Sequence, residues 1–440
     1  MAGRKFGAPM PERIVVGRDR EDAQAYGEKG TAFLGKHIVG KGEEAHLTTG
    51  VLIDVARPHV VLVVGKRGSG KSYDAGIIAE EMTRLPQEVR QNLSVIIIDT
   101  MGIYWSMKKP NERDRELLKE WGLKPQGIDI EFFIPKGHAG EYDKAGIEYD
   151  GMLALPCGEI KPEDWCMAFG FSQVDPHGIA IERAVKHARK LHGGAFGIEE
   201  LTKSIGDDKT TEKQVKDAVS NRFLAAMEWG LFEKKGTTIS RLMQPGKIAV
   251  IDTSHYASAS AGWSVRNLLV GLVSRMVYQE RVLARKAEEN EAMAGEGKGQ
   301  VPMVWIMIDE AHQFLPGDAS TPASEPLLTM VRQGREPGIS LLLITQRPGK
   351  LHEDALAQAD LVISHRLTSR ADIEALRSIM QTYVLEDIEE LINSLPRQKG
   401  TAVILDDNSE RLFAIQVRPR LSWHAGGSPS AIKKKGMFEE

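Results

Sequence analysis

Short apolar runs recur along the chain, and several are followed by a polar loop and then by a stretch with helical spacing. Each run is apolar at successive positions, which is typical of a buried strand in a parallel sheet that helices cover on both faces. We predict such strands at residues 60–64, 95–98, 248–251, 303–308, 340–344, 361–363 and 402–405. Helical patterns occupy about 71–84, 264–290 and 371–379. This alternation predicts an α/β fold with a doubly wound, mostly parallel sheet.

Residues 136–239 interrupt the alternation, because they contain few strand-like runs and are mostly helical in character, with segments near 179–192 and 212–229. We interpret this stretch as an inserted helical subdomain. The tail is rich in Gly and Ser and then in Lys, a composition typical of a solvated end. The sequence thus predicts five parts: an N-terminal arm with one hairpin (1–50), the first part of an α/β core (51–135), the helical insert (136–239), the second part of the core (240–424) and a flexible tail (425–440).

The composition is that of an ordinary globular protein: of 440 residues, 42% are hydrophobic and 27% charged. The 57 Lys and Arg against 61 Asp and Glu give a formal net charge of −4. This balance excludes a histone-like polycation, but it leaves nucleic acid open as a partner, because a basic stripe can lie within a near-neutral total. The two cysteines, Cys157 and Cys166, exclude a disulfide scaffold and a zinc site built from cysteine alone.

No apolar run approaches the roughly 18–20 residues that are needed to span a bilayer. The first residues also lack the apolar core of a signal peptide. We therefore expect a cytoplasmic protein with no membrane partner.

A phosphate-binding loop is the most specific motif in the chain. Residues 65–72 read GKRGSGKS and fit the pattern G-x-x-x-x-G-K-[ST], between a predicted strand and a predicted helix. Glycines let backbone N–H groups curl round phosphates, and the helix adds its positive N-terminus. Lys71 is expected to reach the β- and γ-phosphates and Ser72 to ligate Mg²⁺. The nucleotide-contacting residues predicted from the motif are Gly65, Arg67, Gly68, Ser69, Gly70, Lys71, Ser72 and Tyr73.

Two carboxylates follow a later apolar strand, at Asp309 and Glu310. The carboxyl end of a strand in such a sheet is where ligands bind. There Asp309 would hold the Mg²⁺ shell, and Glu310 would orient and polarise an attacking water. A hydrolase needs this second carboxylate, whereas a nucleotide-binding switch does not. The alternative is an acidic strand end that only caps the segment at 311–312.

Two further polar residues surround the strand at 340–344. Gln346 follows its carboxyl end, where a side chain can touch both the γ-phosphate and the water. Arg335 precedes it, at a predicted helix end, from which it could reach the nucleotide of a neighbouring subunit as an arginine finger. The alternatives are a plain surface arginine, or a bridge from Arg332 or Arg335 to Glu336 or Asp309.

Together these segments resemble the HerA-type ATPases of the HerA/FtsK superfamily. The resemblance runs over about residues 50–427 and rests on GKRGSGKS, IDEAHQFLP, RQGREPGISLLLITQRP, ADLVISHRL and VRPRLSWHAGG. It implies a RecA-like motor that binds ATP and Mg²⁺ between the subunits of a homo-hexameric ring. Members of the family move double-stranded DNA through a central pore. Many work with a nuclease such as NurA, and others work beside an effector in phage defence.

The resemblance also implies roles for single residues. Asp309 and Glu310 become the metal and water carboxylates, Gln346 a sensor, and Arg335 a finger acting in trans. Arg418 resembles part of a closing segment near the nucleotide at a subunit boundary; the alternative is an exposed edge strand with alternating charge.

The chain departs from the family in two places. Ile103 stands where many members have Glu in a DxxGEY-like sequence. Members often also have an N-terminal β-barrel that docks the partner nuclease. Because only 64 residues precede Gly65 here and few form alternating strands, we do not expect docking of a nuclease through such a barrel.

Basic residues that could grip DNA occur after the strand at 95–98 and in the insert. A translocating ring holds the phosphate backbone without reading sequence. The candidates are Lys108, Lys109, Lys186, Arg189, Lys190 and His192; the alternative is a solvated helix face. Two functions stay open on the sequence: a DNA-translocating or unwinding ATPase, and an ATP-binding ring scaffold that organises an effector enzyme without moving DNA.

Overall fold

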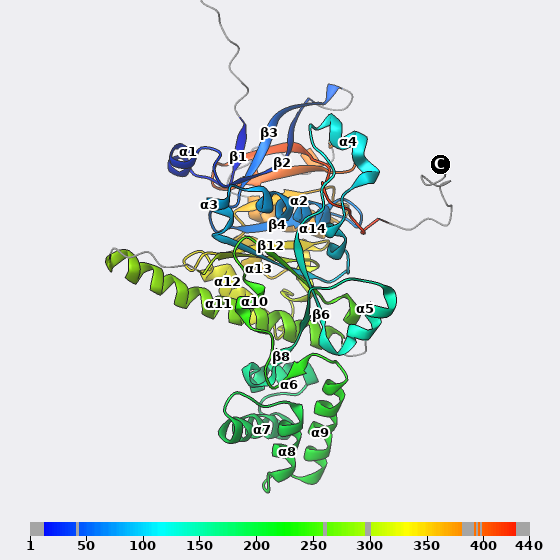
Figure 1. Ribbon diagram of the computed structural model, residues 1–440, viewed down its shortest axis with the longest axis vertical. Coiled ribbons are helices and arrows are strands. Elements are labelled where there is room, and N and C mark those ends of the chain that lie inside the picture. Colours follow the sequence, from blue (N-terminus) through cyan, green and yellow to red (C-terminus); the bar gives the residue numbers. More distant parts are fainter. Residues whose placement is uncertain are drawn as a thin grey trace, which may run out of the picture.

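The computed structural model describes residues 13–40, 44–257, 262–294, 301–380, 391–392, 395–396 and 398–427. Within them, thirteen strands form one large sheet (Figure 1). Eight neighbouring strands are parallel to one another and confirm the predicted α/β class with a mostly parallel sheet. In spatial order they are β13 (Leu361–Ser364), β4 (Val60–Val64), β12 (Ile339–Thr345), β11 (Met303–Ile308), β5 (Leu93–Asp99), β10 (Ile248–Asp252), β6 (Ile130–Pro135) and β7 (Gly151–Leu153).

An antiparallel edge continues the sheet beyond β13. The chain adds, in order, β14 (Thr401–Asp406), β15 (Arg411–Val417), β2 (Thr31–Val39), β3 (His46–Asp54) and β1 (Ile14–Val16), of which only β1 is parallel to its neighbour. The hairpin predicted for the N-terminal arm corresponds to β2 and β3. These strands pair with β15, so the arm extends the same sheet and lies above the central strands in Figure 1.

The predicted strands are all present, with ends that differ by at most two residues. Several others were not predicted from the pattern. β6 ends in Pro135, a residue that sheet strands disfavour. β7 has only three residues, and β15 is half exposed over its first four positions, which weakens the apolar signal.

Helices cover both faces of the sheet, which explains why the central strands are apolar at successive positions. Ile306 of β11 packs into the core that includes the long helix α11 (Gly262–Ala294), whereas Trp305 packs into the core that includes α2 (Lys71–Arg84). The helix predicted at 71–84 matches α2, and the one at 371–379 matches α14 (Arg370–Met380). The other helices near the sheet are α1 (Arg20–Tyr26), α3 (Gln87–Arg90), α4 (Arg115–Glu120), α5 (Ala139–Ala145), α10 (Ile239–Leu242), α12 (Ser324–Gln333) and α13 (Glu353–Ala357).

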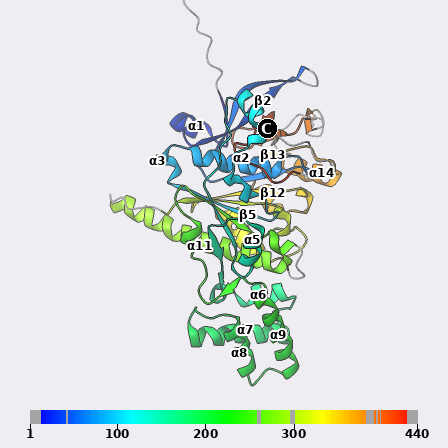
Figure 2. The same cartoon turned by 45° about the vertical axis from the view of Figure 1, so that its right-hand side comes forward.

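The helical insert lies below the sheet in both views of the molecule (Figures 1 and 2). Its core is aromatic: the Trp165 ring lies 5.1 Å from that of Phe223 and 5.0 Å from that of Phe232, between centroids. The segments predicted near 179–192 and 212–229 correspond to α7 and α9. The insert comprises α6 (Pro162–Phe169), α7 (Pro176–His192), α8 (Ile198–Asp207), α9 (Lys213–Met227), and the short strands β8 (Leu155–Pro156) and β9 (Phe232–Glu233).

Candidate functional site

The phosphate loop joins the carboxyl end of β4 to the start of α2. Its glycines have the positive φ angles that the tight curve requires: 155° at Gly65, 76° at Gly68 and 123° at Gly70. A Cβ on Gly65 would lie 2.5 Å from the Ser69 hydroxyl, so no larger residue fits. Because α2 begins at Lys71, its free N–H groups face the loop and favour an anion there. Arg67 lies on the exposed part of the loop.

Lys71 and Ser72 connect this loop to the acidic end of β11. The Lys71 ammonium donates a 3.0 Å hydrogen bond to the Lys66 carbonyl. Burial lowers the pKa of Lys71, while the charges of Glu310 and Asp309 oppose that effect. The Ser72 hydroxyl donates a 2.8 Å hydrogen bond to Asp309 Oδ2. The structure thus brings together the two residues that the sequence predicted as metal ligands.

The two carboxylates that follow β11 are almost fully covered. Asp309 is 3% exposed and Glu310 is 7% exposed. Burial raises the pKa of Asp309 above its ordinary value, and the hydrogen bond from Ser72 works against this rise. Glu310 has a φ of 53°, a left-handed conformation that is uncommon for residues other than glycine and that clusters at functional sites.

Gln346 lies where the sequence placed it, beside the second carboxylate. It follows β12, which pairs with β11, and its amide Nε2 donates a short hydrogen bond to Glu310 Oε1. The other carboxylate oxygen of Glu310 lies 3.4 Å from His312 Nδ1. The Glu310 carboxylate is therefore held between neighbouring polar groups at the loop side of the sheet.

These residues fit a nucleotide and its metal ion. The Ser69 hydroxyl is buried in the loop without a hydrogen-bond partner among the described residues, as expected of a group that faces a phosphate. Hydroxyl and carboxylate oxygens, as on Ser72 and Asp309, are the ligands that Mg²⁺ prefers. The site can thus hold a triphosphate and a divalent ion, with Glu310 available as a base.

Asp99 is a site residue whose role the sequence did not reveal. Its carboxylate accepts hydrogen bonds of 2.7–3.2 Å from the backbone N–H groups of residues 101–104. Burial and the neighbouring Asp252 raise the pKa of Asp99 to about 7, although the N–H groups oppose the rise. The Tyr104 hydroxyl then donates to the Ser72 carbonyl at 3.2 Å. The turn that carries Ile103 therefore supports the start of α2. In the sequence, Asp99 and Gly102 fit the family pattern of this turn, but nothing there indicated what they contact.

His365 also lies behind the phosphate loop and was not predicted as a site residue. It follows β13, and its ring nitrogens lie 2.7 Å from Asp74 Oδ2 and 2.9 Å from the Thr401 carbonyl. A Cβ on Gly65 would come within 2.7 Å of the His365 Cβ. The buried His365–Asp74 pair thus fixes the loop to α2. The ADLVISHRL segment contained the residue, but nothing in it indicated the partner.

Arg335 lies at the amino ends of the parallel strands, whereas the phosphate loop of its own chain lies at their carboxyl ends. It is exposed in the turn before β12, and the structure gives it no ion pair with any described residue, so neither predicted bridge is present. Arg332 instead pairs with Asp354. A cleft of about 560 Å³ opens at this edge, and Arg57, Arg285 and Arg335 are among its lining residues. Since even the five residues of β4 span about 16 Å, Arg335 does not reach its own loop.

The structure corrects both interpretations of Arg418. Its side chain is fully buried and donates to Glu80 Oε2 at 3.0 Å and to Glu81 Oε1 at 2.9 Å, on α2. It is therefore neither an exposed edge residue nor a group beside the phosphate loop.

Tyr73, which the sequence predicted to contact the nucleotide, contacts the C-terminal segment. Its hydroxyl accepts a 2.7 Å hydrogen bond from the backbone N–H of Arg420.

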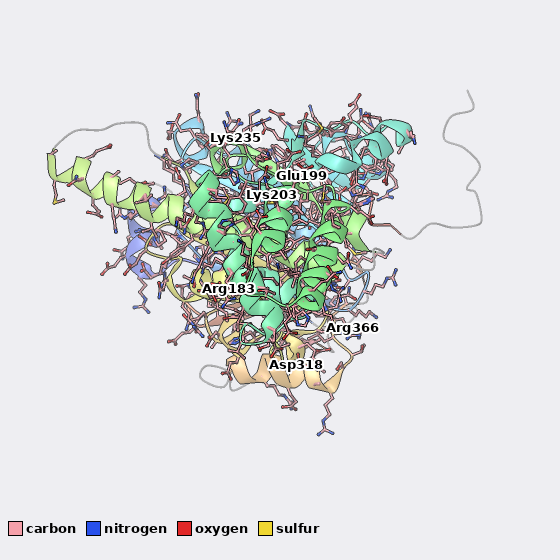
Figure 3. The ribbon with its side chains drawn as sticks, turned by 90° about the horizontal axis from the view of Figure 1, so that it is seen from below. Arg183, Glu199, Lys203, Lys235, Asp318 and Arg366 are labelled. Atoms are coloured by element: carbon pink, nitrogen blue, oxygen red, sulfur yellow. The ribbon has the colours of Figure 1, made fainter. Side chains whose placement is uncertain are left out.

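Three of the six basic candidates for DNA contact have partners in this chain. Lys108 lies 2.6 Å from Asp150 Oδ2, Lys186 pairs with Glu182, and Arg189 donates to a backbone carbonyl of the insert. Figure 3 labels Arg183, Lys203 and Lys235 together with Glu199 on the insert, so this end of the molecule has charges of both signs. The predicted role of these residues in DNA binding stays a prediction.

Two family models cover almost the whole site. The model described as helicase HerA, central domain, matches residues 33–274, and the HerA-like C-terminal model matches residues 272–408. The chain belongs to the HerA helicase family. The resemblance predicted from the motifs is thereby confirmed, and the HerA match includes the phosphate loop, Asp309, Glu310, Arg335 and Gln346.

Curated HerA relatives are longer than this chain. The chain is 27% identical over 394 residues to the DNA double-strand break repair helicase HerA of Pyrococcus furiosus, which covers 80% of this chain and 63% of that protein. It is 22% identical over 377 residues to the HerA of Sulfolobus acidocaldarius, with 84% and 65% covered. The chain therefore spans less than two thirds of the length of these HerA proteins.

Solved structures of related shape support the fold. VirB4 of Thermoanaerobacter pseudethanolicus superposes with a TM-score of 0.53 at 15% identity, over 88% of this chain and 97% of that one. The bacterial conjugative coupling protein TrwB gives a TM-score of 0.53 at 14% identity, over 90% and 96%. Among the described residues of this HerA-family chain, no helix is long and apolar enough to cross a membrane.

Proposed function

We propose that this chain is an ATP-driven motor that translocates on or unwinds double-stranded DNA as a homo-hexameric ring. One observation carries the proposal: in a chain of the HerA family, Ser72 and Asp309 meet at the loop side of the sheet, and Glu310 and Gln346 meet beside them. That combination supports hydrolysis, because a base and its orienting amide stand next to a phosphate-binding loop.

The residues divide the work of hydrolysis. The loop N–H groups hold the phosphates of ATP, and the Lys71 ammonium exchanges the Lys66 carbonyl for the β- and γ-phosphates. Glu310 orients the attacking water and accepts its proton, while Gln346 fixes the direction of the Glu310 carboxylate. Mg²⁺, held by Ser72 and Asp309, would neutralise charge on the phosphates.

The position of Arg335 supports a ring. Because it lies on the far edge of the sheet, it acts on a nucleotide only if a neighbouring subunit presents its phosphate loop to the cleft at that edge. Arg335 would then stabilise the charge that develops as the γ-phosphate leaves. Six subunits arranged in this way enclose a pore for the duplex, in which Lys and Arg hold phosphates irrespective of sequence. A nuclease or a defence effector would work beside the ring.

The second hypothesis, a ring scaffold that binds ATP and organises an effector without moving DNA, predicts a different site. A scaffold has no need of the hydrogen bond between Gln346 and Glu310, which prepares a base for water. The presence of this bond favours the motor.

The test is ATP turnover with and without linear duplex DNA, over a series of salt concentrations. Wild type should be stimulated by duplex at low salt, and the stimulation should fall steeply as salt rises. Glu310→Gln should bind ATP and lose turnover, whereas Glu199→Gln, an exposed carboxylate on the insert, should behave as wild type. Turnover that is indifferent to duplex at every salt concentration would contradict the motor.

A further inference from the structure

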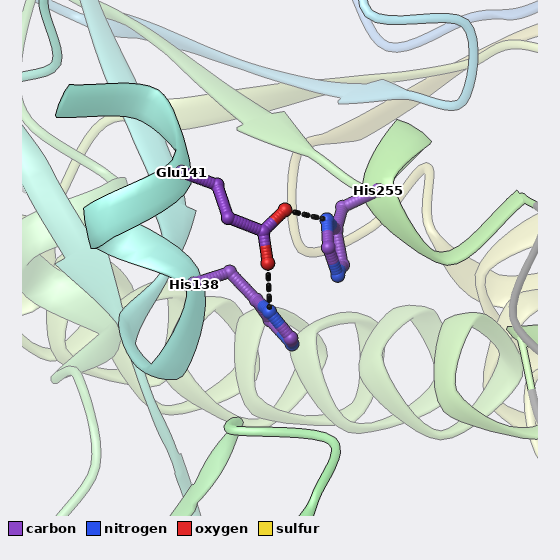
Figure 4. Close-up of side chains that lie close together, drawn as sticks. All are labelled: His138, Glu141 and His255. Carbon is purple, nitrogen blue, oxygen red and sulfur yellow. Dashed lines mark hydrogen bonds and ion pairs between the residues drawn. The ribbon is translucent and has the colours of Figure 1, made fainter. Parts of the chain in front are cut away.

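Three side chains meet where the helical insert joins the sheet (Figure 4). His138 ends the short turn after β6, Glu141 lies one turn further in α5, and His255 lies in the turn Ser254–Ala257 after β10. Because β6 and β10 are parallel neighbours, both turns leave the sheet at the same edge. The topology therefore brings two imidazoles and a carboxylate from separate segments to one place.

The spacing of the three groups is that of metal ligands. His138 Nδ1 lies 3.2 Å from one oxygen of Glu141, and His255 Nδ1 lies 3.3 Å from the other. Nitrogen and oxygen ligands at about 2.0–2.1 Å from a tetrahedral ion stand about 3.3 Å from each other. The two rings lie 3.7 Å apart between centroids, and each presents its Nδ1 to the same carboxylate.

A backbone carbonyl orients the His138 ring at this position. Its Nε2 lies 3.2 Å from the Trp229 carbonyl, and its Nδ1 is the ring nitrogen that faces the Glu141 carboxylate. A ring N–H bonded to a backbone carbonyl is also the usual way in which proteins orient a metal-binding histidine.

Exposure and charge agree with an ion that enters from solvent. The His138 and His255 side chains are 17% and 24% exposed, whereas that of Glu141 is 61% exposed. In the part of the chain that the structure describes, no Lys or Arg forms an ion pair with Glu141, and its contacts within ion-pair distance are with the two rings. The carboxylate side is open for the ion and for a water ligand.

We propose that His138, Glu141 and His255 bind a divalent transition-metal ion of the Zn²⁺ class. Two imidazoles and one carboxylate form a ligand set that suits zinc and leaves a position for water. The ion fastens the turns after β6 and β10 to each other. The same turns hold the insert, since Gly137 N–H donates to the Gly230 carbonyl at 2.7 Å and the Tyr256 hydroxyl donates to the Trp229 carbonyl at 2.7 Å. Bound metal thus stiffens the junction between the insert and the sheet.

The test is direct binding of Zn²⁺ to the chelator-treated full chain by isothermal titration calorimetry, in excess Mg²⁺ so that the oxygen ligands Ser72 and Asp309 are occupied. Wild type should bind about one Zn²⁺ per chain. His138→Ala and His255→Gln should each weaken binding by about 100-fold, and Glu141→Gln by about 10-fold. His187→Ala, at an exposed histidine of α7, is the control and should leave binding unchanged.

A second measurement does not depend on the folding of variants. Co²⁺ added to wild type should give the visible absorption of a four-coordinate nitrogen and oxygen site, and one equivalent of Zn²⁺ should abolish it. Bound zinc should also raise the melting temperature of wild type more than that of His255→Gln. No zinc uptake by wild type, or uptake that His138→Ala and His255→Gln leave unchanged, would overturn the proposal.

Discussion

The Ser72 hydroxyl donates a 2.8 Å hydrogen bond to Asp309 Oδ2 across a separation of 237 residues. The sheet explains how the two meet: β4, which precedes the loop, and β11, which precedes Asp309, both pair with β12 in parallel register. Their carboxyl ends therefore lie at one edge. The insert lengthens the chain between them without separating them, because it leaves the sheet after β7 and returns at β10.

Asp309→Asn should disable hydrolysis that depends on Mg²⁺. The amide keeps the size of the side chain but removes the charge that a hard cation needs. We expect kcat to fall by about 10²–10³ and the Mg²⁺ concentration for half-maximal turnover to rise. Asp318→Asn, at an exposed carboxylate that pairs with Lys350, is the control. An unchanged Mg²⁺ dependence in Asp309→Asn would remove this residue from the metal site.

Glu310→Gln and Gln346→Ala should separate chemistry from binding. Loss of the base should lower kcat by about 10²–10⁴ with ATP binding retained. Gln346→Ala should lower kcat less, because Glu310 keeps its charge and loses only an orienting contact. Turnover and binding of a fluorescent ATP analogue measure the two effects. If Glu310→Gln hydrolyses ATP at the wild-type rate, Glu310 is not the base.

Arg335→Ala should assemble and bind ATP but fail to hydrolyse it, because in the proposed ring Arg335 acts on the nucleotide of the next subunit. Mixed with Lys71→Ala subunits, it should regain part of the activity at interfaces that pair an intact loop with an intact finger. Arg332→Ala, at the end of α12, removes a pair with Asp354 of α13 and is the matched control. Wild-type turnover by Arg335→Ala would exclude the finger.

Glu80→Ala should destabilise the fold strongly. This fully buried carboxylate receives hydrogen bonds from Arg418, Arg420 and the backbone of residues 421–422, so it fixes the C-terminal segment to α2. Although burial opposes ionisation, the two arginines hold the pKa of Glu80 below its ordinary value. The variant leaves buried Arg420 without an ion pair and Arg418 with Glu81 alone, which should cost about 3–5 kcal/mol in free energy of unfolding, measured with urea. Arg411→Ala, exposed on β15, should cost little, and a similar loss in both variants would contradict this role of Glu80.

His59 should make stability depend on pH. Its Nδ1 lies 2.6 Å from Asp360 Oδ2; burial favours the neutral ring, but Asp360 and Asp54 outweigh it and raise the pKa of His59 from 6.5 to about 9. Since the folded pKa exceeds the unfolded one, this stabilisation is complete below pH 6.5 and is lost as pH rises through about 9. The melting temperature of wild type should fall over this window more than that of His59→Gln. Parallel curves for the two proteins would exclude His59 as the cause.

The sequence predicts those site residues that belong to short local motifs. The phosphate loop, the acidic pair and Gln346 each occupy a strand end, and in a parallel sheet strand ends converge. The pairs that support them do not follow, since Glu80 meets Ser422 across 342 residues and His365 meets Asp74 across 291. No local pattern encodes such partners.

Arg418 shows a different limit. Arginines are mostly exposed, so charges at 418 and 420 predict a surface segment. The structure buries both because Glu80 on α2 pairs with each of them and Glu81 pairs with Arg418 as well. The sequence placed Arg335 correctly before β12. Only the sheet shows that this position is at the amino ends of the strands, away from the phosphate loop of the same chain.

Displacement of a third strand from duplex DNA tests the central claim most directly. A motor that moves along the duplex should release a bound triplex-forming oligonucleotide when ATP is added. Wild type is expected to release it in an ATP-dependent manner, Glu310→Gln should release none, and Glu199→Gln should match wild type. ATP hydrolysis by wild type without release of the third strand would contradict translocation and favour the ring scaffold.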